Sequence, residues 1–248
     1  MTNNFLEENL HRIFDCNIWL DIEKSAFLSP EIASDVKEYK PKSGVYSTIL
    51  SYTKSPETAN LYLMEQHKKN PDKYFAYTAA PVMREMDIDL LIKSNAAFIR
   101  LFPGKLNFKL AGGETERLLC VLEDRRLPLM VWHTETSWRE IGEICGRHPD
   151  LPVIVDGNDK KLLYHNRVYI PLLLKHRNLY IETFNLIQYM FYETAVKKYG
   201  IERFLFGTNY PSNSPLAPLY MLLYADIPEE SKENILNKNI KKLISGIK

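Results

Sequence analysis

Residues 127–156 read LPLMVWHTETSWREIGEICGRHPDLPVIVD, and this stretch decides the fold class. It opens with an apolar run, Pro128–His133, and closes with a second one, Pro152–Asp156. The polar segment between them has a helix expected to start near Trp138. Short runs that are apolar on both faces are typical of parallel strands covered by helices. The stretch therefore predicts a right-handed βαβ unit within a parallel sheet.

The same alternation continues through the whole chain. Apolar runs predict eight strands, at Ile13–Trp19, Val45–Tyr52, Tyr74–Val82, Ala97–Phe102, Pro128–His133, Pro152–Asp156, Leu179–Thr183 and Phe204–Thr208. No GxGxxG or P-loop motif follows any of them, which argues against an open nucleotide-binding sheet. Eight βα units favour closure into a ring. The sequence thus predicts an α/β fold, a single (β/α)8 TIM-type barrel domain over residues 1–248.

Several helix signals fall between these strands. Ser29-Pro30-Glu31 and Ser55-Pro56-Glu57 each place proline at the first helical position behind a serine cap. Gly200 is expected to end the helix that runs from Tyr192 to Tyr199. Residues 115–126 read as a surface helix. Ser231–Ile247 carries an apolar stripe and is expected to close the barrel from outside.

Composition excludes several partners. Thirty-two basic and 31 acidic residues give a net charge of +1, which offers no electrostatic footprint for nucleic acid or an anionic membrane. The polar, acidic start is unlike a secretory signal, and no apolar stretch reaches the roughly 18 residues that span a membrane. We therefore expect a cytoplasmic protein whose partner is a small-molecule ligand or substrate. Oligomers are common among such barrels, and on that ground alone a homodimer is expected.

The cysteines and most histidines are expected to be structural. Cys16, Cys120 and Cys145 are odd in number and widely separated in apolar surroundings, which indicates reduced, buried thiols. Five histidines fall in predicted helices or loops without i, i+4 partners and are interpreted as surface residues: His11, His67, His148, His165 and His176.

Polar residues at the carboxyl ends of the strands are the candidates for function. His133 can titrate near neutrality and act as a general acid or base, or it can simply bond its neighbours. Asp156 ends the next strand, where it would orient His133, act as a base, or cap the following turn. Arg100 lies in an apolar strand and needs a partner. That partner is either a substrate carboxylate or, as we favour, Glu182, which has the same ambiguity.

Several of these segments resemble the amidohydrolase superfamily, in its amidohydrolase-related (amidohydrolase 2) branch. Residues 15–19, Asp-Cys-Asn-Ile-Trp, resemble that branch's Asp-x-His-x-His strand, and residues 205–211, Leu-Phe-Gly-Thr-Asn-Tyr-Pro, resemble its Leu-Phe-Gly-Ser-Asp-Tyr-Pro strand. Residues 127–133, 152–157 and 233–240 resemble three further segments. The resemblance spans nearly the whole chain and implies a metal-dependent hydrolase barrel. The branch includes lactonases and decarboxylases of aromatic acids.

The resemblance also implies where a metal would bind. It puts the family's ligands at Asn17, Trp19, His133 and Asn209, and its water-activating histidine at Asp156. An amide is a poor zinc ligand and an indole has no lone pair to coordinate. We therefore expect no metal and no other cofactor.

Two functions stay open. One is a metal-independent hydrolase or lactonase for a carboxylate-bearing substrate, in which His133 with Asp156 activates water. In this hypothesis Asn17 and Asn209 would bond the developing oxyanion, and Arg100 would hold the substrate carboxylate. The expected substrate site comprises Asn17, Trp19, Arg100, Glu182, Asn209 and Tyr210.

The other function is that of a catalytically inactive relative, in which Trp19 fills the former metal cavity and the mouth binds a ligand or partner. An open pocket with His133 and Asp156 in hydrogen-bond reach favours the enzyme. Trp19 packed across the mouth favours the binding protein.

Overall fold

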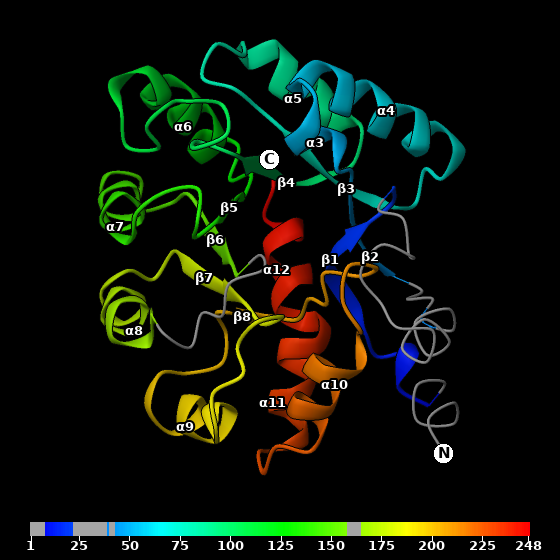
Figure 1. The fold of residues 1–248 in the computed structure, drawn as a ribbon, viewed down its shortest axis with the longest axis vertical. Helices are drawn as coiled ribbons and strands as arrows, with labels where there is room; N and C mark the ends of the chain where they lie inside the picture. The colour runs from blue at the N-terminus through cyan, green and yellow to red at the C-terminus, as the bar shows by residue number, and fades with distance from the viewer. Residues whose placement is uncertain (1–7, 22–38, 40–42, 158–164) are drawn as a thin grey trace.

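The computed structural model describes residues 8–21, 39, 43–157 and 165–248. Its centre is one eight-stranded parallel sheet in which each strand bonds the next along the chain (Figure 1). The strands are β1 Phe14–Trp19, β2 Ser43–Ser47, β3 Tyr74–Thr78, β4 Ala96–Leu101, β5 Leu129–Trp132, β6 Val153–Asp156, β7 Leu179–Glu182 and β8 Phe204–Leu205.

The sheet closes on itself between β1 and the segment that follows β8. The Cys16 amide donates to the Phe206 carbonyl at 2.9 Å, and the Trp19 amide donates to the Tyr210 carbonyl at 2.7 Å. A parallel bridge pairs Ile18 with Tyr210. The predicted (β/α)8 barrel is therefore confirmed.

Helices surround this ring (Figure 1). They are α3 Leu50–Thr53, α4 Pro56–Lys69, α5 Glu85–Lys93, α6 Gly113–Asp124, α7 Trp138–Arg147, α8 Asn166–Lys175, α9 Phe191–Lys198, α10 Leu216–Leu223, α11 Glu229–Glu233, the π-helical turn Asn234–Lys238 and α12 Asn239–Ser245. None of the described helices is long and apolar enough to cross a membrane.

The predicted helix signals act as caps where they are described. Ser55 caps α4 by accepting a bond from the Thr58 amide, with Pro56 at the first helical position. Gly200, at φ +75°, ends α9 in the left-handed conformation that glycine adopts without steric cost. The signal at Ser29-Pro30-Glu31 lies outside the described residues.

The second predicted strand was wrong at its end. We predicted Val45–Tyr52, but β2 stops at Ser47 and residues 50–53 are helical. The cause is Asp21, whose carboxylate accepts bonds from the Thr48 hydroxyl and, at 2.8 Å, from the Ile49 amide. These bonds turn the chain at the end of the strand, where the sequence alone shows only a continuing apolar run.

The last helix, α12, fills the amino-terminal end of the barrel. Ile240 and Leu243 pack into one apolar cluster with inward-facing strand residues, among them Phe14, Met130 and Ile154. Asn239 fixes the start of this helix through bonds to two main-chain carbonyls near β8. Figure 1 shows α12 across the middle of the ring. An apolar cluster therefore occupies the barrel interior next to α12, and the site residues at the strand ends lie toward the opposite end.

Candidate functional site

The centre of the barrel holds a buried cation, Arg100 of β4, whose side chain is 1% exposed. Its guanidinium donates to Asp156 Oδ2 at 3.0 Å and to Asn17 Oδ1 at 2.7 Å. Its Nε donates to Ser47 Oγ at 3.0 Å. A buried charge is tolerated only when it is paired and hydrogen-bonded, and these contacts meet that condition. Arg100 is thus tied to β1, β2 and β6 at once.

Trp19 lies over this cation and is bonded to Asn209. The Arg100 guanidinium carbon is 4.8 Å from the centroid of the Trp19 ring, a cation–π distance. The Trp19 indole nitrogen donates to Asn209 Oδ1 at 2.7 Å. The structure therefore brings two of the predicted substrate-site residues together and bonds them to each other.

Asp156, not Glu182, forms the ion pair with Arg100, so our favoured pairing was wrong. Asp156 stands on β6, two strands from β4, whereas Glu182 stands on β7, one strand further round the ring. Asp156 Oδ2 also accepts from the Trp132 indole at 3.1 Å and from Asn17 Nδ2 at 3.2 Å. This oxygen is saturated by donors from three strands.

Glu182 is buried beside this ion pair. Its Oε1 accepts from the Phe184 amide at 2.7 Å, and Asn17 Nδ2 lies 3.4 Å from Oε2. Burial, and next the nearby Asp156 charge, raise the pKa of Glu182 well above its usual range. Gly207 leaves room for the carboxyl group, because a Cβ there would clash with it and lie 3.0 Å from Asn17 Cβ. Burial beside Asp156 thus favours the neutral acid form of Glu182, while Asp156 pairs with Arg100.

A pH-dependent stability follows from Glu182. A carboxyl group whose pKa is raised in the folded state stabilises the fold fully below its usual pKa of 4.5. That stabilisation is lost as the pH rises through the folded-state pKa. Glu182→Gln cannot ionise, so its free energy of unfolding should fall less than that of the parent between about pH 5 and about pH 8. Urea titrations at both pH values measure the difference. Glu143→Gln, at an exposed position of α7, is the control, and equal slopes for Glu182→Gln and the parent would contradict the assignment.

Asp15 has a structural position at the start of the same network. Its carboxylate accepts bonds from the Asn17 and Thr208 amides at 2.9 and 3.2 Å. It also accepts from the Tyr39 and Thr208 hydroxyls at 2.9 and 2.5 Å. These contacts tie β1 to the segment after β8, where the barrel closes.

His133 lies at the end of β5 and is 6% exposed. Its contact with Asp156 goes through the main chain, since His133 Nδ1 is 3.4 Å from the Asp156 carbonyl oxygen. The ring stacks on Trp138 at 6.1 Å and meets His165 edge-on at 5.0 Å. Burial lowers the pKa of His133 below its usual value. Its imidazole is therefore neutral at neutral pH.

Aromatic side chains pack around this network near the carboxyl ends of the strands. The Trp132 ring lies 5.9 Å from Trp19, 4.9 Å from Phe102 and 5.1 Å from Tyr52. Tyr210 is 9% exposed and packs against Tyr39. Ser47 and Trp132 are the site residues that sequence reasoning missed. Their position at strand ends was the available signal, but both residue types suit a core.

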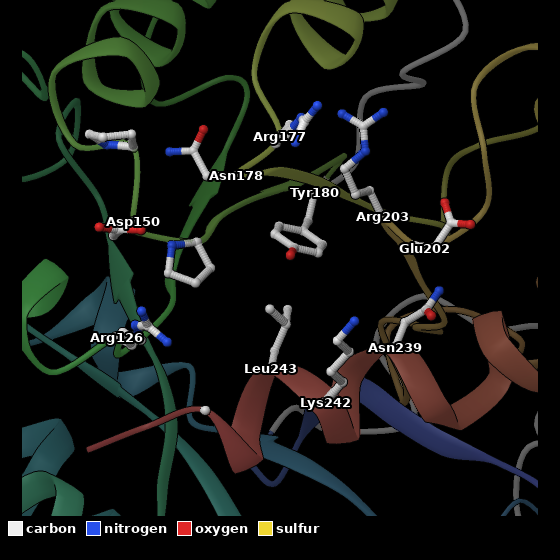
Figure 2. A pocket seen from close by; sticks show the side chains of 13 residues that line it. Arg126, Asp150, Arg177, Asn178, Tyr180, Glu202, Arg203, Asn239, Lys242 and Leu243 are labelled. Carbon is white, nitrogen blue, oxygen red and sulfur yellow. The ribbon is translucent and has the colours of Figure 1, made fainter.

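A cavity of about 600 Å³ lies at the other end of the barrel (Figure 2). Its lining includes Tyr180 of β7, Lys242 and Leu243 of α12, and Arg203 before β8. None of the predicted site residues contacts it. The cavity is therefore separate from the network around Arg100.

A family model described as amidohydrolase matches residues 51–245. The chain belongs to the amidohydrolase family. This membership confirms the resemblance first indicated by the strand ends. No curated protein matches this amidohydrolase-family chain in sequence.

Solved structures share the fold of this amidohydrolase-family chain. An uncharacterized TIM-barrel protein from Bordetella bronchiseptica is 17% identical with a TM-score of 0.71, covering 94% of this chain and 98% of that one. A dihydroxybenzoic acid decarboxylase from Polaromonas, solved with manganese and 2-nitroresorcinol, is 13% identical with a TM-score of 0.68, covering 94% and 96%. A Pseudomonas putida protein, provisionally named a 2-pyrone-4,6-dicarboxylic acid hydrolase, is 13% identical with a TM-score of 0.66, covering 94% and 97%.

Proposed function

We propose that this chain is a hydrolase that works without a metal in its barrel, with the Arg100 guanidinium in the place of the metal. The observation that carries the proposal is the bonding of Arg100 to Asn17 and Asp156. In the family that the sequence resembles, the position of Asn17 holds a metal ligand, and the position of Asp156 holds the histidine that activates water. A fixed internal cation now contacts both.

The donor set around Arg100 does not suit a divalent metal. The Asn17 amide oxygen already accepts a bond from Arg100, and Trp19 offers an indole over the cation. A divalent ion beside the guanidinium would be repelled in a buried setting, where charges interact more strongly than in water. Zinc prefers imidazole, thiolate and carboxylate ligands, and of the four ligand positions only His133 offers one. These points support the metal-independent proposal.

His133 is the base in this proposal. A neutral imidazole can take a proton from water as the water attacks an ester carbonyl, and it can return that proton to the leaving alkoxide. An activated ester or lactone suits such a site because it needs less electrophilic help than an amide. Arg100 directs three N–H donors to protein groups, which favours a structural role over contact with a substrate carboxylate.

The substrate class is a small molecule that carries a carboxylate. Two of the solved structures with this fold are named for carboxylic acids, a dihydroxybenzoic acid decarboxylase and a 2-pyrone-4,6-dicarboxylic acid hydrolase. Asn209 and Tyr210, which follow β8, are the proposed substrate contacts together with Trp19. The side chains of these residues lie near the carboxyl ends of the strands, where barrels of this kind bind substrates.

A second function, a catalytically inactive relative that binds a ligand or partner, is favoured by two observations. Trp19 packs against Trp132 in the aromatic cluster, and Asp156 Oδ2 is bonded to three donors. A carboxylate held this way makes a weak base. In this hypothesis the protein has the family's fold but does not catalyse a reaction.

Three further properties belong to the proposal. The free cysteines are compatible with a reducing, cytoplasmic location. One barrel spanning the described chain supports a single domain over residues 1–248. A homodimer stays a prediction, to be measured by light scattering.

The test is a screen of carboxylate-bearing esters and lactones with untagged protein, run with and without a strong chelator. Hydrolysis that is unchanged by the chelator supports the metal-independent enzyme. Hydrolysis that the chelator abolishes contradicts it. Absence of turnover, with thermal stabilisation by the same compounds, contradicts the enzyme and favours the binding protein.

A further inference from the structure

Two residues that sequence reasoning misplaced meet on the outer helix layer, away from the barrel mouth. Cys120 was expected to be buried and is exposed on α6, whereas His148 was expected on the surface and is buried at the end of α7. Glu116 lies one turn before Cys120, on the same face of α6. One ligand atom from each of these residues lies within 4.8 Å of the other two.

The His148 ring is oriented as a metal ligand would be. Its side chain is 3% exposed, and Nδ1 lies 2.8 Å from Glu123 Oε2. Because Glu123 accepts the Nδ1 proton, the lone pair of a neutral ring falls on Nε2. Nε2 is buried and has no hydrogen-bond partner among the described residues, while Glu116 Oε1 is 3.3 Å away. A buried nitrogen left without a bond is costly, and this one faces the cluster.

The surrounding groups hold this arrangement in place. Glu123 Oε1 accepts from the Asp150 amide at 3.0 Å, so the carboxylate behind His148 is fixed at both oxygens. Arg147 pairs with Glu116 Oε2 and donates to the Ala111 carbonyl at 3.1 Å, which leaves Oε1 facing His148. A carboxylate that orients the far nitrogen of a ligating histidine is the usual second layer of a zinc site.

We propose that Glu116, Cys120 and His148 form a zinc-binding site on the outer face of the barrel, with Glu123 as the positioning residue. Zinc–ligand lengths of about 2.0–2.3 Å put tetrahedral ligands roughly 3.3–3.8 Å apart. The His148–Glu116 separation of 3.3 Å already fits, and Cys120 is exposed and free to adjust. A thiolate and an imidazole select zinc over calcium or magnesium. Three protein ligands leave a fourth position for water or another molecule.

An imidazolium is the competing explanation of the same contacts. A protonated His148 would bridge Glu116 and Glu123 and would need no metal. The two explanations differ in what Cys120 does. The thiol has no role in the imidazolium pair, whereas in the zinc site it is a ligand.

The test uses cobalt(II) as a spectroscopic substitute for zinc, with the full chain under reducing conditions. The parent protein should bind one equivalent and show the near-ultraviolet thiolate-to-cobalt charge-transfer band. Zinc should displace the cobalt and remove that band. In Cys120→Ser the band should be absent and zinc affinity should fall at least tenfold. Glu123→Gln should weaken zinc binding by about 10- to 100-fold while keeping the band at saturation.

Asp124→Asn is the matched control. It removes a neighbouring carboxylate on α6 that is not in the ligand set, so binding should stay within about twofold of the parent. Thermal melts of each variant check that it is folded. A parent protein without the charge-transfer band, or zinc affinity unchanged in Cys120→Ser, overturns the proposal.

Discussion

Arg100→Met is expected to lower the free energy of unfolding by about 3–5 kcal/mol, the cost of removing one partner from a buried ion pair. The substitution keeps most of the side-chain volume but leaves Asp156 charged and buried at 0% exposure. It also removes the bonds that join Asn17 and Ser47 to β4. Urea unfolding, followed by tryptophan fluorescence and circular dichroism, measures the change.

Two further variants separate the charge from the packing. Arg139→Met removes an exposed arginine paired with Glu143 on α7 and should cost no more than about 0.5 kcal/mol. The double variant Arg100→Met with Asp156→Asn should be less destabilised than the sum of the two single variants, because neither charge is then left alone. A loss below about 1 kcal/mol for Arg100→Met would contradict a buried, bonded cation at the centre of the barrel.

His133→Ala is expected to lower kcat/KM for a hydrolysed ester by about 10²- to 10⁴-fold, the usual contribution of a general base. The substitution removes the imidazole at the end of β5. His11→Ala, at an exposed position, is the control and should leave the rate unchanged. If His133→Ala keeps its rate within about threefold of the parent, the base assignment is wrong.

The pH profile gives an independent check on the same residue. The base must be neutral to accept a proton, so activity should rise with pH and reach a plateau. Burial lowers the pKa of His133, and the midpoint of that rise should therefore lie below the usual value of 6.5. A midpoint above 6.5 would mean that another group controls the reaction.

The barrel could be predicted because its determinants are local. Each buried strand is a short apolar run, and caps such as Ser55-Pro56 fix helix starts by bonds within a few residues. Some predicted strands ran too long, and the error at the end of β2 has a non-local cause, since Asp21 reaches across from the segment after β1 to bond the Ile49 amide. The local sequence pattern around Ile49 does not include Asp21, so it cannot indicate that contact.

The candidate site could be predicted only as a set of residues. Strand ends identified Asn17, Arg100, Asp156 and Glu182, and all four meet in the barrel. Their pairing could not be predicted, because it depends on how far the Arg100 side chain reaches around the ring. The raised pKa of Glu182 depends likewise on its own burial and on the nearby Asp156 charge, which are properties of the assembled fold.

The outer cluster escaped sequence reasoning for a related reason. Histidines without i, i+4 partners were interpreted as surface residues, but the partners of His148 lie on another helix, α6. Cys120 was expected to be buried because its neighbours in the sequence are apolar, yet its side chain is exposed on that helix. Both errors come from judging a residue by adjacent positions in the chain.

The most direct test of the central claim is the metal content of Cys120→Ser protein, purified without a tag or chelator and measured by elemental analysis. This variant weakens the proposed outer zinc site, and Asp156→Asn then distinguishes metal in the barrel from metal left at that outer site. With Arg100 as the internal cation, we predict far less than one equivalent of zinc, manganese or iron. Close to one equivalent, lost when Asp156 is changed to Asn, would place a metal in the barrel and contradict the account.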